Sequence, residues 1–368
     1  MLKKEIQIVA FENPYPPNYG GAIDVFYKIK ALNEIGINVI LHAFYSERND
    51  ISGLKPYCKT IHLYKRNTRL TKMFSVLPYT VATRCSNALK DNLNKSEAPI
   101  VFESLRVAAV LQKHDFKQKT AVRCHNIEHD YNWGLFKSER NWLKKTAFYF
   151  EGLKYKYFER VLNKADILLP ISNYETIYFK KHYRPKSCFL PVFQENNNIT
   201  AQKGFGKYAL YHGDLSVADN LRVAFFMADV FKSLNVPLII ASSTKAPELI
   251  EHIKKHAHIS FQLILNNKQL DGLIENAHIN TLYSFQRSGT KLKVFNALFK
   301  GRHCIVNKNM VDDEAVLSVC TVAETKTDYQ NTVIRLFDEK FVLSQKRIEA
   351  LKKYDTKQNA KKLVGIMF

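Results

Sequence analysis

The sequence predicts an α/β protein built from two Rossmann-like domains. Two series of short apolar strands alternate with amphipathic helices, one before and one after residue 200, and this alternation is typical of parallel sheets. A polar run at 194–206, rich in Asn, Gln and Gly, separates the two series. The chain has 368 residues, of which 46% are hydrophobic, so it is long enough for two cores. We expect domains at 1–193 and 207–350, a linker at 194–206 and a closing segment at 351–368.

The first series begins with a strand at 6–11, a loop rich in Pro and Gly at 13–21, and a helix that runs to about residue 36. A second strand at 38–44 completes a right-handed βαβ unit. Gly20 and Gly21 are adjacent, so the backbone there can approach a ligand closely. They lack the Gly-x-Gly-x-x-Gly spacing of a dinucleotide site, which argues against a dehydrogenase. A tight strand-to-helix turn is the alternative interpretation.

Polar side chains follow the next two strands, at 99–102 and 120–124. In an open α/β sheet the carboxyl ends of the strands face the ligand crevice. We therefore expect one set of residues in that crevice: Glu103, Arg123, His125, Asn126 and Glu128. A single histidine is more often structural than catalytic, so placement at a strand end leaves both interpretations of His125 open.

Two basic stretches, at 65–95 and 137–164, are predicted to be helical. The second contains eight basic residues against three acidic ones, with aromatic residues interleaved. Cations and aromatic rings on one helix suit the interface of an anionic bilayer. The first stretch is a candidate acceptor or membrane surface. For both, core packing of the rings and a solvated basic face are the alternatives.

The second series opens with a strand at 208–212 and a loop at Gly213, and continues with strands at 237–241, 261–265 and 279–282. Its strongest local pattern is at 287–306, which reads as loop, helix, turn and buried strand. Ser288 or Thr290 can cap this helix, and Gly301 stands where a helix ends in the left-handed conformation. Backbone N–H groups at such a helix start suit a diphosphate. An ordinary structural helix is the alternative.

The net charge of +21 calls for an anionic partner. Residues 1–194 hold 31 Lys/Arg against 17 Asp/Glu, and the remainder holds 24 against 17, so the excess lies mainly in the first half. Nucleic acid, an anionic membrane and phosphorylated substrates are the candidate partners, and a generally basic surface without a dedicated partner is the alternative. We expect no nucleic-acid partner, because neither a recognition helix nor a base-stacking motif is present.

The six cysteines are scattered without Cys-x-x-Cys spacing, which is typical of free thiols in a reducing cytoplasm. The N-terminal apolar run is short and interrupted by Glu5 and Gln7, so we expect a strand there and not a signal peptide. No apolar run approaches the length of a membrane span. We therefore expect a cytoplasmic protein. Peripheral attachment to the inner membrane face is compatible with this expectation.

The run Gly289-Thr290-Lys291-Leu292-Lys293 closely resembles the donor-binding segment of GT-B glycosyltransferases of family 4. Four further segments are similar to that family: the Pro-x-x-x-Gly-Gly loop that ends at Gly21, the Arg-x-His-Asn-x-Glu run of 123–128, the Ala-Asp-x-x-x-x-x-Ser run of 165–172, and Tyr-His-Gly-Asp-Leu at 211–215. The resemblance covers nearly the whole chain.

The resemblance implies two Rossmann-like domains that face each other across a cleft, with the segment 351–368 crossing back to the first domain. It implies a retaining, metal-independent transfer from a UDP- or GDP-linked sugar to a lipid-linked or polysaccharide precursor, with no cofactor, as in bacterial polysaccharide biosynthesis. His125 is then the catalytic candidate, near the donor sugar. The donor-binding candidates are Gly20, Gly21, Gly213, Arg287, Ser288, Gly289, Thr290, Lys291, Lys293 and Asn296. The acceptor-side candidates are Glu103, Arg123, Asn126 and Glu128.

The sequence departs from the family at three positions. Ser288 and Asn296 stand where many members carry Glu, and the second of those Glu residues grips the ribose hydroxyls. Asp219 stands where a basic residue is common. Asparagine can hydrogen-bond a ribose only without charge assistance. A catalytically silent GT-B scaffold and a sugar-nucleotide epimerase are therefore the alternative functions.

Overall fold

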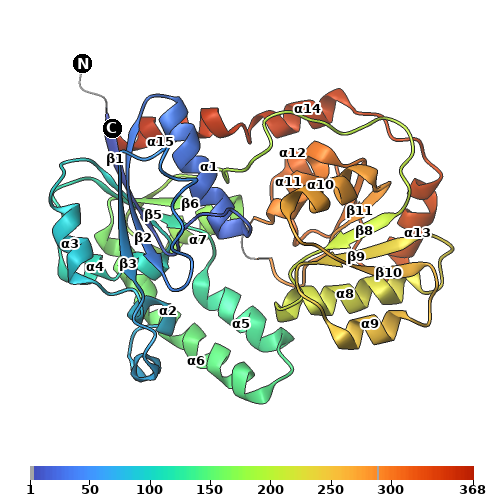
Figure 1. The fold of residues 1–368 in the computed structure, drawn as a ribbon, viewed down its shortest axis with the longest axis horizontal. Helices are drawn as coiled ribbons and strands as arrows, with labels where there is room; N and C mark the ends of the chain where they lie inside the picture. Colours follow the sequence, from blue (N-terminus) through green and yellow to red (C-terminus); the bar gives the residue numbers. More distant parts are fainter. Residues whose placement is uncertain (1–3, 288–289) are drawn as a thin grey trace. The chain divides into compact units, whose positions relative to one another are not determined.

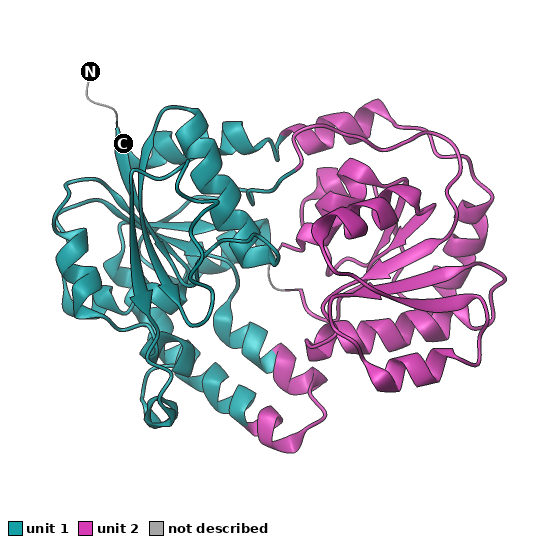
Figure 2. Ribbon diagram, in the orientation of Figure 1, with its two compact units in different colours: residues 1–133, 147–195, 353–368 teal, residues 134–146, 196–352 magenta. Residues whose placement is uncertain are grey.

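The computed structural model describes residues 4–287 and 290–368, which form two compact units (Figure 2). The first unit comprises the chain up to Trp133, Ala147–Glu195 and Lys353–Phe368. The second comprises Gly134–Thr146 and Asn196–Lys352. The main division thus falls after Glu195, at the polar run, and the last helix belongs to the first unit.

The first unit is built on a parallel sheet of seven strands within the described residues (Figure 1). Its spatial order is β3-β2-β1-β4-β5-β6-β7. The strand bounds are β1 Glu5–Ala10, β2 Asn38–Tyr45, β3 Thr60–Lys65, β4 Ile100–Glu103, β5 Thr120–Cys124, β6 Ile167–Pro170 and β7 Lys186–Ser187. Strands β2 and β3 extend the sheet on one side of β1, and β4 to β7 extend it on the other, so the strand order reverses between β1 and β4. Ligands of open α/β sheets bind at such a reversal.

Alternate side chains of the central strands enter two different cores. Ile8 and Val101 pack with helices α1 (Gly20–Glu34) and α15 (Thr356–Met367) on one face. Val9 and Phe102 pack on the opposite face with residues of α3, α6 and α7. The sheet is therefore buried on both sides, as a parallel sheet requires.

The remaining helices of this part of the chain are shorter than the sequence suggested. The basic stretch 65–95 is not one helical region, because it contains the end of β3 and three short helices. The bounds are η1 Leu70–Phe74, α2 Tyr79–Ala82, α3 Asn87–Leu93, η2 Leu105–Val107, α4 Val110–Lys113, α5 Glu128–Ser138, α6 Trp142–Phe158, η3 Glu159–Lys164 and α7 Asn173–His182. The stretch 137–164 is likewise interrupted, between α5 and α6.

The second unit contains a parallel sheet of six strands among the described residues, in the order β10-β9-β8-β11-β12-β13. The strand bounds are β8 Ala209–His212, β9 Leu238–Ser242, β10 Ile259–Leu263, β11 Ile279–Thr281, β12 His303–Val306 and β13 Thr321–Val322. Helices α8, α9 and α13 cover one face of this sheet, and α10 packs on the other. The helix bounds are α8 Ala218–Phe231, α9 Pro247–Ile253, α10 Asn267–Asn276, α11 Leu292–Lys300, α12 Glu314–Leu317, α13 Lys326–Phe337 and α14 Gln345–Lys352.

Two local expectations for the 287–306 region are wrong. Helix α11 begins after Lys291, which makes no side-chain capping bond, so Thr290 is not its N-cap. Gly301 has φ −92°, which is not the left-handed region. A glycine is needed there for space, because a Cβ atom would lie 2.2 Å from Asn280 Nδ2.

Across the described residues, every helix is too short or too polar to cross a lipid bilayer.

Candidate functional site

In the first unit, the inner face of helix α1 carries two charged side chains. Asp24 and Lys28 are one helical turn apart, and both are buried among the apolar residues of α1. The Lys28 ammonium lies 3.1 Å from Asp24 Oδ2. Burying charges in a core is costly unless they are paired, so their environment must supply further partners.

Glu103 and Arg123, at the ends of β4 and β5, supply those partners. Lys28 Nζ donates to both carboxylate oxygens of Glu103 at 2.6 Å. Arg123 donates to both oxygens of Asp24, at 3.0 and 3.2 Å, and its remaining N–H groups bond the carbonyls of Leu190 and Pro191. The four side chains therefore form a closed and charge-balanced group, which we call the buried ion-pair network.

The network keeps both carboxylates ionised. Burial raises the pKa of Asp24, but the charges of Arg123 and Lys28 outweigh burial and hold that pKa well below its usual range. Burial also raises the pKa of Glu103, but Lys28 and His125 together outweigh burial, so that this pKa is lowered as well. Both groups thus remain charged throughout the neutral range.

His125 directly follows β5, and the network lies beneath it. Its Nε2 atom is 3.6 Å from Asp24 Oδ2 and 3.7 Å from Glu103 Oε2, and within the described residues it has no hydrogen-bond partner. The ring meets Phe11 edge-on, with centroids 6.0 Å apart. The sequence prediction that His125 lies at a strand end among polar groups matches this placement.

Of the two adjacent glycines, Gly21 makes room for this packing. Helix α1 begins at Gly20, which is exposed. A Cβ atom on Gly21 would lie 2.6 Å from Phe11 Cζ, so the absence of a side chain at Gly21 lets Phe11 reach His125.

The acceptor-side candidates separate into two groups. Glu103 and Arg123 are fully buried within the network, where each bonds an oppositely charged side chain. Glu128 is also buried, and its Oε2 lies 3.3 Å from Arg106 Nη2. Asn126 is half-buried beside His125. Of the four, Asn126 is the least buried.

Ser104, between β4 and Arg106, has φ +143°. A non-glycine residue in this region is strained, and such residues persist where the surrounding structure fixes them, often at functional sites. Its hydroxyl accepts from Arg106 N at 3.2 Å and lies 3.5 Å from Glu128 Oε1. The sequence gives no signal for this strain.

Asp24, Glu103 and His125 are the cluster among the described residues whose atoms could hold a metal ion. The site does not fit one, because Lys28 Nζ already occupies the position between the two carboxylates where a cation would bind. A divalent ion would have to displace a buried ammonium and would meet the Arg123 charge.

In the second unit, Lys293 of α11 lies against the carboxyl end of β8. Its Nζ atom donates to His212 O at 3.2 Å and to Asn220 Oδ1 at 3.3 Å. Gly213 lies beside it, and a Cβ atom on Gly213 would be 3.3 Å from Lys293 Nζ. Burial lowers the pKa of Lys293 to about 8, with a smaller contribution from the charge of Lys291. Lys293 is thus mostly charged at neutral pH.

Asp219, in the first turn of α8, opposes these cations. Its carboxylate accepts from Ser284 Oγ and Ser138 Oγ, each at 3.4 Å. Burial raises the pKa of Asp219, while the charges of Lys291 and Lys293 lower it. Asp219, at the position where the resemblance to family 4 implies a basic side chain, therefore reduces the positive charge here.

The other donor-binding candidates have mixed positions. Arg287 is exposed, whereas Thr290, Lys291 and Asn296 are half-buried. The Asn296 Oδ1 atom accepts from Asn196 Nδ2 at 3.0 Å, so a ribose there would share Asn296 with the segment that follows the unit boundary. Ser288 and Gly289 lie outside the described residues.

We name this second group the lysine-glycine site: Gly213, Asn220, Lys291, Lys293 and Asp219. The start of α11 contributes backbone N–H groups with a partial positive charge, and Lys293 contributes a full charge. The site can therefore stabilise an anion. It lies at the carboxyl end of a parallel strand, where ligands of such sheets bind.

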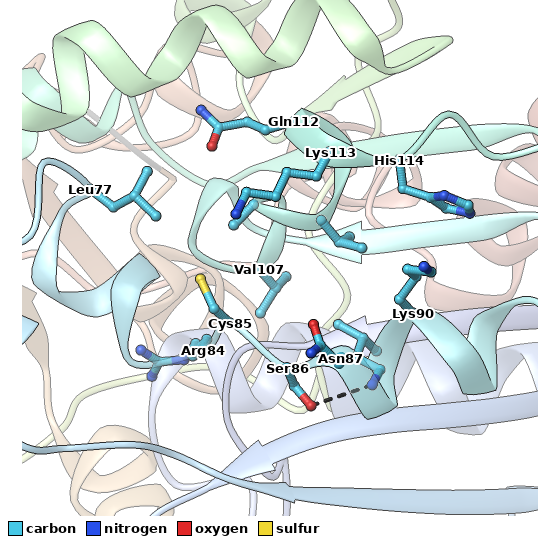
Figure 3. Close-up of a pocket in the computed structure, with 13 residues that line it drawn as sticks. Leu77, Arg84, Cys85, Ser86, Asn87, Lys90, Val107, Gln112, Lys113 and His114 are labelled. Atoms are coloured by element: carbon cyan, nitrogen blue, oxygen red, sulfur yellow. Dashed lines mark hydrogen bonds between the residues drawn. The ribbon is translucent and has the colours of Figure 1, made fainter.

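The first unit also contains a cavity of about 250 Å³ (Figure 3). Lys90 and Lys113 border it, and Arg84 lies at its base with every side-chain nitrogen already bonded. None of the residues of the buried ion-pair network lines this cavity. Its lining is Leu77, Arg84, Cys85, Ser86, Asn87, Leu89, Lys90, Val107, Ala109, Val110, Gln112, Lys113 and His114.

Sequence reasoning missed Asp24 and Lys28, which complete the network, and Phe11, which contacts His125. One signal was available for the first two. They are spaced by four residues on the face of α1 whose other members are Val25, Ile29 and Leu32. Opposite charges at that spacing on an apolar face indicate buried partners elsewhere in the fold.

No family model matches the sequence. An uncharacterized 44.6 kDa protein in the cps region of Klebsiella pneumoniae is 31% identical over 180 residues, which is 46% of this chain and 46% of that protein. The match thus spans less than half of either chain.

Solved structures match over the whole chain. Sucrose-phosphate synthase from Thermosynechococcus elongatus has a TM-score of 0.66 at 13% identity, covering 100% of this chain and 95% of its own. Anabaena HepE, solved with UDP and glucose, has a TM-score of 0.68 at 10% identity, covering 99% of both chains. A mutant of S. aureus TarM, solved with fondaparinux, α-GlcNAc-glycerol and UDP, has a TM-score of 0.69 at 11% identity, also covering 99% of both.

These proteins share the arrangement described above, in which two parallel-sheet units of the Rossmann type follow one another along the chain. The resemblance drawn from the sequence is confirmed at the level of the fold: this chain has the GT-B fold.

Proposed function

We propose that this protein is a glycosyltransferase that moves a sugar from a UDP- or GDP-linked donor to a glycan or lipid-linked precursor. The observation that carries the proposal is the lysine-glycine site. A cation, a helix start and a glycine meet there at the end of β8 in a protein with the GT-B fold. A departing diphosphate requires this kind of electrostatic stabilisation.

The solved relatives support the choice of donor. HepE and TarM were both solved with UDP, and HepE also with glucose. The relative from the cps region of Klebsiella pneumoniae supports polysaccharide biosynthesis as the setting. We further propose that transfer retains the anomeric configuration and proceeds without a metal, with Lys293 and the α11 N–H groups facing the diphosphate and His125 near the sugar.

The test is release of nucleoside diphosphate by the purified full chain from a panel of UDP- and GDP-sugars, with glycan and lipid-linked acceptors. Parallel reactions with a chelator examine metal independence, and NMR of the product examines the anomeric configuration. His125→Ala is expected to lower turnover at least tenfold, about 1.4 kcal/mol in barrier. Folding is expected to be retained, because Lys28 and Arg123 still pair with both buried carboxylates when the imidazole is removed.

A catalytically silent scaffold is the second candidate, and Asp219 and Asn296 favour it, because both weaken a diphosphate and ribose site. Nucleotide binding without turnover on any donor would support the scaffold. Conversion of the donor without release of diphosphate would instead indicate an epimerase.

A further inference from the structure

Two segments of the first unit expose large apolar side chains. In the loop around η1, Phe74 is 91% exposed and Val76 is 83% exposed. Large apolar side chains gathered on a surface mark an interaction site, whereas isolated ones are ordinary. The exposed apolar residues of the two segments are Leu70, Met73, Phe74 and Val76 in the loop and Tyr149, Phe150, Leu153 and Tyr157 on α6.

Hydrogen bonds hold these two segments side by side (Figure 1). Lys154 Nζ donates to Met73 O at 2.8 Å, and Tyr79 N donates to Glu151 Oε2 at 2.8 Å. The loop is therefore fixed against α6, and the two sets of exposed residues lie on neighbouring segments. We call these residues together the loop-α6 surface.

The exposed face of α6 is a helical stripe. Phe150, Leu153 and Tyr157 are spaced by three and four residues, so they lie on one side. Tyr155 and Phe158 point to the opposite side and are buried in the core of the unit. The stripe is therefore additional to the core and is not required to hold α6 in place.

The charges around the loop-α6 surface are of one sign. Residues 51–90 contain eight Lys/Arg and no Asp/Glu. On α6, Glu151 is paired with Lys154 at 3.3 Å, and Glu159, the first residue of η3, is buried. Arg69, Lys156 and Arg160 are exposed. The loop-α6 surface thus exposes apolar side chains that are bordered by cations.

We propose that the loop-α6 surface docks on an anionic lipid bilayer. Phe74 and Val76 enter the acyl region, Tyr149 and Tyr157 lie at headgroup depth, and the cations contact acidic headgroups. An anionic bilayer binds apolar side chains in its interior and attracts cations to its headgroups, and the loop-α6 surface offers both. A second copy of this chain is a poorer fit, because the cations would face each other across a symmetric interface.

The proposal does not depend on the glycosyltransferase proposal, and its test uses no sugar nucleotide. The full chain is sedimented with vesicles of phosphatidylcholine alone, or of equal parts phosphatidylcholine and phosphatidylglycerol. Binding is expected on the anionic vesicles only, and added salt should weaken it. Equal binding to both kinds of vesicle, or binding to neither, overturns the proposal.

Two pairs of variants locate the surface. Phe74→Ser with Val76→Ser should lower vesicle binding at least tenfold without a change in melting temperature. The matched control is Leu265→Ser with Val342→Ser, which removes two exposed apolar side chains from the second unit and should leave binding unchanged. Arg69→Gln with Lys156→Gln should reduce binding to anionic vesicles, and Lys245→Gln with Lys255→Gln should not.

A tryptophan at position 74 reports how deeply the loop inserts into the bilayer. In Phe74→Trp, the fluorescence should shift to the blue on addition of anionic vesicles, and brominated acyl chains should quench it more than they quench the wild type. An unshifted spectrum would contradict insertion of the loop. Self-association in the absence of lipid that Phe74→Ser abolishes would mean that a second copy covers the surface, and would also overturn the proposal.

Discussion

The two candidate sites handle charge in opposite ways. In the first unit, two carboxylates and two cations are fully buried and paired with one another, so the group is closed and balanced. In the second unit, Lys293 is half-buried and donates to the neutral oxygens of His212 and Asn220, and the nearby charges of Lys291 and Lys293 lower the pKa of Asp219 against the effect of burial. A balanced network can fix the position of His125 but cannot bind a new charge. An unbalanced one can accept an anion.

The largest effect should come from breaking the balance in the first unit. Lys28→Met leaves Asp24 and Glu103 buried with a single cation, which should lower the free energy of unfolding by about 3–5 kcal/mol. Urea unfolding measures this loss. Lys30→Met, on the same helix but half-buried, is the control and should stay within about 0.5 kcal/mol of wild type. A similar loss in both variants would mean that Lys28 acts only through helix packing.

The next largest effect concerns the cation of the lysine-glycine site. Lys293→Met should weaken UDP or GDP binding by about 1.5–3 kcal/mol, roughly 10- to 100-fold, because a charged hydrogen bond to the diphosphate is lost. Isothermal titration calorimetry measures it. Lys300→Met is the control on the same helix, since Lys300 is paired with Asp271.

The lowered pKa of Lys293 predicts that nucleoside diphosphate binding depends on pH. The ammonium carries its charge below its pKa of about 8 and loses it above. Wild-type affinity for the nucleoside diphosphate should therefore fall as the pH rises from 7 to 9, while the affinity of Lys293→Met stays flat over that range. Parallel curves for the two proteins would remove Lys293 from the binding site.

Removing the opposing charge should act in the other direction. Asp219→Asn is expected to strengthen nucleoside diphosphate binding by about 1 kcal/mol, roughly fivefold, because Lys291 and Lys293 would no longer face a carboxylate. Asp229→Asn, on the same helix and paired with Lys232, is the control and should leave affinity unchanged. Weaker binding in Asp219→Asn would show that the carboxylate positions the site.

The smallest effect concerns the ribose. Asn296→Glu restores the charge-assisted bond that the family pattern implies, and it should strengthen binding by roughly 1 kcal/mol or less, because Asn196 already bonds this position. Asn276→Glu adds the same charge elsewhere in the second unit and controls for a general electrostatic effect. Unaltered affinity would mean that the ribose does not reach Asn296.

The sequence determined the local elements and the strand ends. Alternating apolar runs placed β5 at 120–124, and so placed His125 directly after a buried strand. The same reasoning placed Gly213 after β8, since a strand of four buried residues ends at His212. Both inferences depend on short-range periodicity, which a single sequence contains.

The tertiary structure alone decided which charged residues are buried and with whom. Lys28 and Glu103 are 75 positions apart, and Asp24 and Arg123 are 99 apart, so no local pattern links them. Glu103 and Arg123 were therefore expected to meet an acceptor, although the fold pairs them internally. Gly301 shows the same limit. A glycine is needed at the end of α11 because the side chain of Asn280, from β11, leaves no room for a Cβ atom. Periodicity defines a strand and where it ends, whereas packing between distant segments decides what each side chain there contacts.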